Sequence, residues 1–170
     1  MTTPQRARPE TAATSTDSAT ATLGTLRRFV LALFTMGILG TAADLLLTGH
    51  VEDAWQLAPL VLIALSAVTL LWHAAKPSRS TVRLHQGVMW LFIASGLVGT
   101  FLHYRANIEF ELEMYPGLSG LELLWKAVQG ASPPSLAPGA MIALGLLGLV
   151  YAYRHPALDS GANDRKEKTP

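Results

Sequence analysis

Residues 29–47 read FVLALFTMGILGTAADLLL, and Asp44 is the only charged side chain in this stretch. An α-helix rises about 1.5 Å per residue, so about 20 apolar residues cross a hydrocarbon core about 30 Å thick. The stretch is apolar on all sides rather than along one stripe, as expected of a helix surrounded by lipid. It therefore predicts a membrane-spanning helix.

Three further apolar stretches follow, at residues 55–75, 84–104 and 137–153. Their centres read LAPLVLIALSAVTLLW, VMWLFIASGLVGTFL and GAMIALGLLGLVYAY, without the alternation typical of barrel strands. Four buried helices of a soluble all-α protein are the alternative, but such helices usually carry polar faces. The predicted fold class is an all-α membrane protein. It has four transmembrane helices and a short amphipathic external helix between the third and the fourth.

The overall composition agrees with this fold class. Half of the 170 residues are hydrophobic and 15% are charged, compared with about 25% in soluble domains. The formal net charge of +1 argues against a nucleic-acid partner. The chain has no cysteine, which excludes disulfides, thiolate metal sites and cysteine nucleophiles. With no phosphate-binding glycine loop and no nucleophile elbow in the sequence, we predict that the protein is not an enzyme.

Both ends of the chain are polar. Residues 1–24 and 156–170 lack apolar periodicity, so they cannot bury enough surface to offset their ordering entropy. We expect two disordered tails that flank a transmembrane domain over residues 25–155. Arg27 and Arg28 before the first apolar run also suit a signal peptide, but the run continues through Leu45–Leu47 past the would-be cleavage site. A retained first helix is therefore favoured.

The basic residues are distributed unequally along the chain. All 13 Lys and Arg residues except Arg105 and Lys126 lie before the first stretch, between the second and third, or after the fourth. The positive-inside rule then places both termini in the cytoplasm. The expected location is a bacterial-type cytoplasmic membrane, crossed several times.

The connection between the third and fourth stretches, residues 105–136, is predicted to lie outside. Residues 108–114 read IEFELEM, and this alternation predicts an extended segment with Glu109, Glu111 and Glu113 on one side. Ser119 and Glu122 have the spacing of a capping box at a helix start.

The residues after this capping box have the pattern of an amphipathic helix. The apolar residues that recur at helical spacing are Leu121, Leu124, Trp125 and Val128. We expect a short helix that lies at the outer membrane surface or caps the bundle.

Asp44 is the first candidate functional residue. A carboxylate near the bilayer centre costs about 2.5–3.5 kcal/mol, and less near an edge. His103 and Arg105 are expected at comparable depth, because the first and third helices run in the same direction. We expect Asp44 to pair with one of them, as a structural ion pair or a proton or ion relay, or else to reach the interface. The candidate binding residues are Asp44, His103, Arg105, Glu109, Glu111 and Glu113.

A metal site is the second hypothesis. The candidate ligands on the outer side are His50, Glu52, Asp53 and His103, because imidazole and carboxylate together can hold a divalent metal such as zinc. No spacing matches a known ligand motif, and a solvated acidic rim is the alternative.

Three further histidines raise the question of haem. His73, His85 and His155 stand at the inner ends of the second, third and fourth stretches, so b-type haem ligation is a further alternative. Haem ligands of that kind usually sit deeper in the membrane. The sequence therefore predicts no obligatory cofactor.

Small residues recur four positions apart, as in Gly96 with Thr100 and Gly148 with Ala152. This spacing lets helix backbones approach closely, within one bundle or between protomers. It predicts tight packing rather than a function.

Two function classes remain open. One is a non-catalytic accessory or interaction subunit of a membrane complex. The other is a small oligomeric transporter or an ion- or metal-handling protein, whose midplane should carry polar groups or broken helices. The midplane here offers little beyond Thr35, Ser66 and Ser95, which favours the accessory subunit. The expected partners are the lipid bilayer and either another membrane protein or a second copy of the chain.

Overall fold

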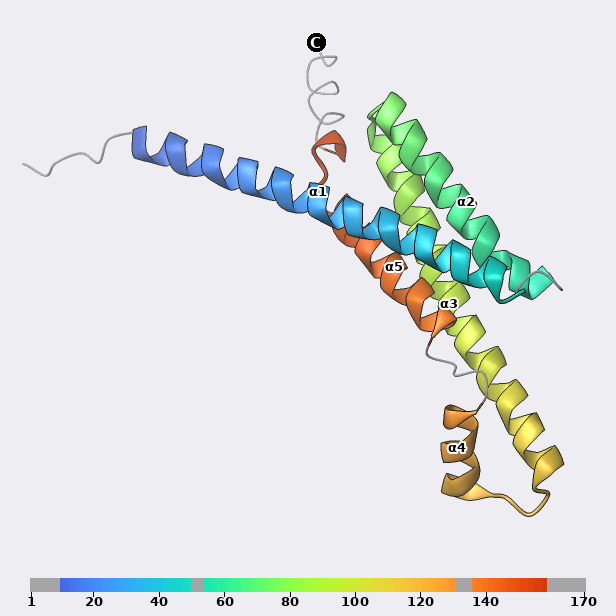
Figure 1. Cartoon of the computed structure of the whole chain (residues 1–170). Coiled ribbons are helices and arrows are strands. Elements are labelled where there is room, and N and C mark those ends of the chain that lie inside the picture. The colour runs from blue at the N-terminus through green and yellow to red at the C-terminus, as the bar shows by residue number, and fades with distance from the viewer. Residues whose placement is uncertain (1–9, 50–53, 131–135, 159–170) are drawn as a thin grey trace, which may run out of the picture.

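The computed structural model describes residues 10–49, 54–130 and 136–158, with side chains from residue 18 onward. These residues form five α-helices and a short 3-10 turn (Figure 1). The elements are α1 (Glu10–Leu47), α2 (Ala54–Ala75), α3 (Arg79–Met114), α4 (Gly120–Gln129), α5 (Ala137–Ala152) and η1 (Pro156–Leu158). The predicted all-α class is confirmed for the part of the chain that the structure describes.

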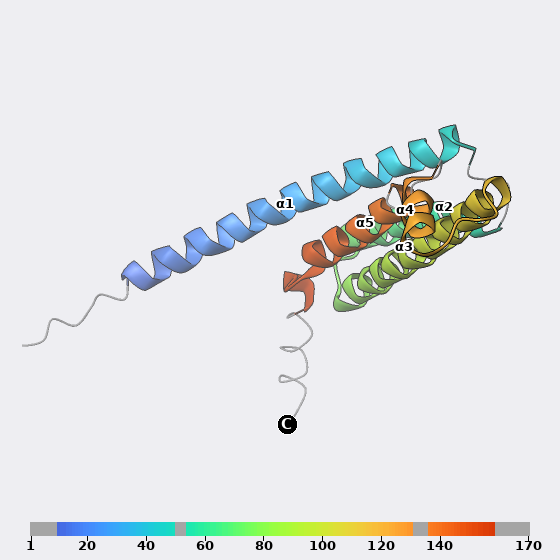
Figure 2. The same cartoon turned by 90° about the horizontal axis from the view of Figure 1, so that it is seen from below.

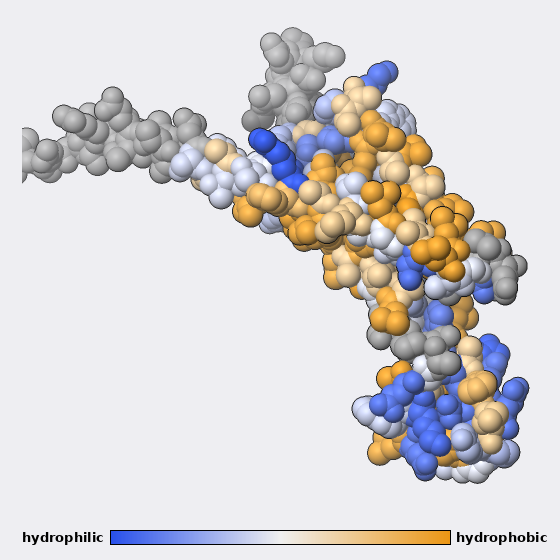
Figure 3. Space-filling model, in the orientation of Figure 1, coloured by the Kyte–Doolittle hydropathy of each residue, from blue (hydrophilic) through white to orange (hydrophobic). Residues whose placement is uncertain are grey.

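Three helices are long and apolar enough to cross a membrane: α1 from Ser18 onward, α2 and α3. The fourth apolar helix, α5, has 16 residues and therefore spans about 24 Å, less than a hydrocarbon core of about 30 Å. The fourth span thus stays a prediction. Apolar side chains cover much of the visible surface of the bundle, as expected of helices that face lipid (Figure 3).

The closest packing in the bundle is between α3 and α5. α5 packs against α3 on one side and α1 on the other, while α2 packs against α3 (Figure 2). The buried core includes Phe34 of α1, Met89 and Phe92 of α3, and Met141 and Leu144 of α5. α1 therefore joins the bundle mainly through α5.

Two glycines show how closely α5 approaches its neighbours. A Cβ atom added at Gly96 of α3 would lie 2.6 Å from the carbonyl oxygen of Pro138 and 2.6 Å from Cγ1 of Ile142. A Cβ at Gly148 of α5 would overlap the side chain of Met89. The predicted close packing at these small residues is therefore confirmed, and it joins helices of the same chain.

The two tails are more ordered than predicted. α1 begins at Glu10, so residues 10–24 are helical rather than disordered. A helix that is packed further along the chain extends without a new nucleation step, which the composition argument overlooked. Pro156–Leu158 form η1, where Ala157 packs against Val82 and Ala152. The remaining residues of the predicted tails, 1–9 and 159–170, lie outside the described residues.

The prediction of an extended segment at residues 108–114 is wrong, because α3 continues as a helix to Met114. Arg105 Nε donates to Glu109 Oε1 at 2.8 Å, one helical turn away, and Glu and Leu are good helix formers. Glu109 and Glu113 therefore share one helix face, and Glu111 lies on another. The alternation covers only seven residues, and it did not stop the helix that begins at Arg79 from continuing through them.

The starts of α4 and α3 also differ from expectation. Ser119 precedes α4 as predicted, but its side chain makes no capping hydrogen bond. Gly120 directly after it has φ +62°, a left-handed conformation that interrupts the backbone path a capping box requires. A capping box forms instead at α3, where Ser78 Oγ accepts from the Thr81 amide at 3.2 Å and Thr81 Oγ1 accepts from the Ser78 amide at 3.2 Å.

Candidate functional site

The predicted outer residues do not converge on one site. Arg105 pairs with Glu109 on the exposed surface of α3, and Asp44 is exposed near the end of α1. Among the residues whose side chains are described, Asp44 makes no ion pair, so the expected pairing inside the bundle is not seen. Glu113 is exposed and Glu111 partly buried near the end of α3.

The predicted metal ligands cannot be assembled from the described residues. His50, Glu52 and Asp53 lie outside them, and His103 lines a groove between α2 and α3. Within residues 10–49, 54–130 and 136–158, no three His, Asp or Glu side chains are grouped so as to hold a metal ion. The metal hypothesis therefore stays untested.

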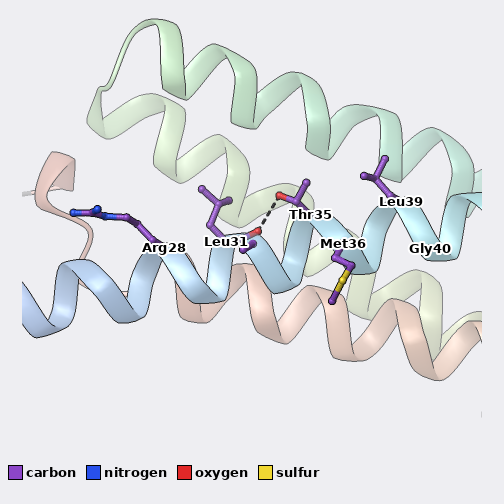
Figure 4. A pocket seen from close by; sticks show the side chains of 7 residues that line it. Arg28, Leu31, Thr35, Met36, Leu39 and Gly40 are labelled. Carbon is purple, nitrogen blue, oxygen red and sulfur yellow. Dashed lines mark hydrogen bonds between the residues drawn. The ribbon is translucent and has the colours of Figure 1, made fainter.

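Hollows occur on the apolar surface of the described residues. The groove at His103 has a volume of about 860 Å³ and is lined mainly by apolar side chains of α2 and α3, together with Leu45 of α1 and three residues at the start of α5. A second hollow lies along α1, between Arg28 and Gly40 (Figure 4). The Thr35 hydroxyl in this hollow already donates to the Leu31 carbonyl oxygen at 2.8 Å. Both hollows suit lipid chains better than a polar substrate.

The far end of α3 and α4 form a helical hairpin, which we call the outer hairpin (residues 105–129). α4 runs back beside the end of α3, beyond the rest of the bundle (Figure 1). Asn107, only 6% exposed, donates from Nδ2 to the Ala127 carbonyl oxygen at 2.9 Å. Lys126 Nζ lies 4.2 Å from the centre of the Tyr115 ring. These contacts hold α4 alongside the end of α3.

The apolar stripe predicted on α4 is exposed in the hairpin. Ala127 is the buried residue of α4, whereas Leu121 is 82% and Trp125 64% exposed. Phe110 and Met114 on the end of α3 are also exposed. The stripe is therefore not used to pack α4 onto α3.

At the opposite end of the bundle, three histidines that are far apart in the sequence lie together. His73 ends α2, His85 lies in the second turn of α3 and His155 follows α5. The ring centroids of His73 and His155 are 4.7 Å apart, and Tyr151 lies 5.6 Å from His155 and 6.0 Å from His85. We call His73, His85, Tyr151 and His155 the histidine cluster.

Two threonine–histidine pairs join α2 and α3 reciprocally. Thr69 and His73 are four residues apart on α2, and Thr81 and His85 are four apart on α3. Thr69 Oγ1 lies 3.0 Å from His85 Nδ1, and Thr81 Oγ1 lies 2.8 Å from His73 Nδ1. The repeated spacing at the facing ends of two antiparallel helices is the sequence signal that could have revealed this arrangement.

Each of the two threonine hydroxyls also has a backbone carbonyl oxygen within hydrogen-bond distance. A threonine hydroxyl has one proton. Thr69 donates its proton to the Ser66 carbonyl oxygen at 2.9 Å, and Thr81 donates to the Ser78 carbonyl oxygen at 2.9 Å. Nε2 of His85 is buried and has no hydrogen-bond partner in the described part of the chain.

The tautomer of His155 follows from its backbone contact. Its Nδ1 accepts from the backbone amide of Ala157 at 3.3 Å, so this nitrogen carries no proton. Burial, together with the nearby His73 and Arg27, lowers the pKa of His155 to about 4. His155 is therefore neutral at physiological pH.

Arg27 of α1 completes this end of the bundle. Its Nε donates to the Tyr151 carbonyl oxygen at 3.3 Å, and its Nη2 donates to the carbonyl oxygens of Tyr153 and Arg154 at 3.4 and 3.2 Å. The last carbonyls of a helix lack partners within the helix and carry partial negative charge. The guanidinium satisfies them and ties α1 to the end of α5.

The histidine cluster does not fit haem ligation through His85. Its ring lies edge-to-face against Phe34 and Tyr151, with centroid distances of 5.7 and 6.0 Å. Contacts of this kind leave no room for a macrocycle beside the ring. What the cluster offers chemically is three imidazoles that come from the end of α2, the start of α3 and the turn after α5.

Two features of the described chain thus stand out: an exposed outer hairpin and a buried histidine cluster at the opposite end. Comparisons with models of protein families, with curated proteins and with solved structures give no match to this chain.

Proposed function

We propose that this protein is a non-catalytic accessory subunit of a complex in the cytoplasmic membrane, which contacts its partner through the outer hairpin. α1, α2, α3 and α5 are then the four membrane-embedded helices, with α5 accommodated by local thinning of the bilayer. The basic residues near Arg27, Arg79 and Arg154 support placing that end, and both termini, on the cytoplasmic side.

One observation carries the proposal: large apolar side chains are exposed on a hairpin that extends beyond the membrane-spanning part. α3 continues about 15 Å past Tyr104, since its ten further residues each rise about 1.5 Å. α4 lies along this extension rather than across it, so its stripe does not lie flat on a membrane surface. Exposed apolar patches of this kind, rimmed by polar groups, mark protein interaction sites.

The charges on the hairpin indicate the chemistry of the partner. Four glutamates lie on it, against the two basic residues Arg105 and Lys126; the glutamates are Glu109, Glu111, Glu113 and Glu122. Opposite potentials favour association, and like charges oppose it. The partner that fits is therefore an apolar segment flanked by Lys or Arg. A second copy of the same hairpin would bring like charges together.

The docking chemistry can be tested with two fluorescent helical peptides, one of Leu and Lys and one of Leu and Glu. We expect the protein in phosphatidylcholine nanodiscs to bind the lysine peptide about tenfold or more tightly, measured by fluorescence anisotropy. Glu113→Gln with Glu122→Gln should remove most of this preference, and Leu121→Ser with Trp125→Ser should remove binding. The matched control is Lys126→Gln on the same helix, which should not weaken binding.

Three results would contradict this docking surface. They are equal binding of the two peptides, unchanged binding by the serine variant, and equal binding of the lysine peptide to empty nanodiscs. The last of these would assign the apolar stripe to lipid.

The proposed topology can be tested because the chain has no cysteine. Ser119→Cys, before α4, and Ser80→Cys, in the first turn of α3, place single exposed thiols at opposite ends. A membrane-impermeant maleimide should label Ser119→Cys in cells with an intact cytoplasmic membrane, and Ser80→Cys only after permeabilisation. The reverse pattern would invert the topology, and labelling of both before permeabilisation would contradict the span number.

A further inference from the structure

We propose that the histidine cluster is a proton-binding site that holds the turn after α5 against α2 and α3 while its histidines are neutral, and releases this turn when they are protonated. The turn comprises residues 153–158. The proposal concerns the inner end of the bundle and is independent of the partner of the outer hairpin.

The first step is that the closed turn requires a neutral His155. Its Nδ1 accepts the amide proton of Ala157, which a protonated imidazole cannot do because both its nitrogens carry protons. Protonation therefore replaces a hydrogen bond with two opposed N–H groups. Ala157 is the buried residue of η1 and packs against Val82 of α3, so loss of this bond destabilises the packing of the whole turn.

The second step is that no acidic side chain within the described part of the chain compensates a charge on His155. Arg27 of α1, His73 of α2, His85 of α3 and Tyr151 of α5 face the cluster. Every Asp and Glu whose side chain the structure describes lies instead near the opposite end of the bundle, at Asp44, Glu109, Glu111, Glu113 and Glu122. A proton on His155 thus meets a fixed positive charge at Arg27, and a second proton on His73 would bring two cations together at a ring distance of 4.7 Å.

The third step is that protons can reach the cluster from water. His155 is partly exposed, and the adjoining Tyr153 and Arg154 are exposed. His73 and His85 lie behind it, where Nε2 of His85 is buried without a hydrogen-bond partner in the described chain. Entry of a proton at His155 opens the turn and uncovers the two inner rings, so the first proton favours the next.

The pH window follows from the direction of the shift. An exposed histidine has a pKa of about 6.5, and the pKa of His155 in the closed turn is lowered to about 4. The closed turn is therefore fully favoured above about pH 6.5 and loses stability as the pH falls from there towards 4.

Hydrogen exchange measured by mass spectrometry tests this site on the unmodified chain in nanodiscs. The reporter amides are those of His155, Ala157 and Leu158, which donate to Ala152 O, His155 Nδ1 and His155 O. We expect their protection to fall on the order of tenfold between pH 7.5 and 5.0, after the known pH dependence of chemical exchange is divided out. Amides in the middle of α2 and α3 should keep their protection and show that the fold is intact.

Two variants at His155 distinguish an effect of its protonation from a general loss of packing in the turn. His155→Asn keeps an acceptor near the position of Nδ1 but does not titrate, so its turn should stay protected at both pH values. His155→Lys is charged throughout and lacks the acceptor, so its turn should exchange rapidly at both. His103→Asn at the other end of the bundle is the matched control and should respond to pH as the unmodified chain does.

Equal protection of the turn at pH 7.5 and 5.0 in the unmodified chain would overturn the proposal. So would a His155→Asn variant whose turn still loses protection at pH 5.0, because the responding group would then be elsewhere.

Discussion

Replacing Gly96 with leucine is expected to separate α5 from α3 and to unfold much of the bundle. The first atom of the new side chain would lie 2.6 Å from the backbone oxygen of Pro138, which moves only if α5 moves. Overpacking a well-filled core costs about 1–3 kcal/mol, and the cost rises when backbone has to shift. Because α1 joins the bundle mainly through α5, we expect it to be loosened as well.

The measurement is thermal unfolding in a mild detergent, followed by circular dichroism and gel filtration. The matched control is Gly87→Leu on the same helix, because a Cβ at Gly87 meets nothing within 4 Å. We expect a lower melting temperature and a broad elution profile for Gly96→Leu, and little change for Gly87→Leu. Equal melting temperatures for the two variants would mean that α3 and α5 do not pack as described.

The second large effect is expected for Arg27→Gln, which should release α1 from the end of α5. The guanidinium donates one hydrogen bond to a carbonyl oxygen in the last turn of α5, at Tyr151, and two to the chain just after it, at Tyr153 and Arg154. Hydrogen bonds from charged donors contribute about 1.5–3 kcal/mol when buried, and partial exposure here reduces the total to about 1–2 kcal/mol. Spin labels at Leu26→Cys on α1 and Leu146→Cys on α5 should report a longer and broader distance distribution.

Arg28→Gln is the matched control, because Arg28 is the next residue and lies on the exposed face of α1. It removes the same charge without touching α5, so its distance distribution should equal that of the unmodified chain. Arg27→Gln should also raise the pKa of His155, since Arg27 contributes to lowering it. Identical distances in both variants would show that the carbonyl contacts do not hold α1.

The apolar runs alone predicted where α1, α2, α3 and α5 lie, because about 20 consecutive apolar residues have few other stable arrangements. They did not predict where the helices end. α3 passes Tyr104 by ten residues through local contacts such as Arg105–Glu109, which hydropathy does not measure. The sequence did not predict the exposure of Trp125 either. An amphipathic stripe predicts that some surface covers it, but not whether that surface belongs to the same chain.

The histidine cluster shows a different limit of sequence reasoning. His73, His85 and His155 were recognised as residues at the inner ends of helices, but their meeting depends on which helices pack together. That packing is decided by close approach at residues such as Gly96 and Gly148, and many pairs of small residues look alike in the sequence. The hydrogen-bond partners Thr69 and Thr81 carried the missing information in their four-residue spacing from the histidines.

The attachment of α1 to α5 has a consequence for how the protein is made. Arg27 binds the carbonyl oxygen of Tyr151, 124 residues later in the chain. At a synthesis rate of about 5–20 residues per second, α1 waits roughly 6–25 s in the membrane before its main packing surface has been translated. During that time its apolar face is available to lipid or to insertion factors. α1 therefore docks only after α5 has been made, and a ribosome that stalls before α5 leaves α1 without its main contact in the bundle.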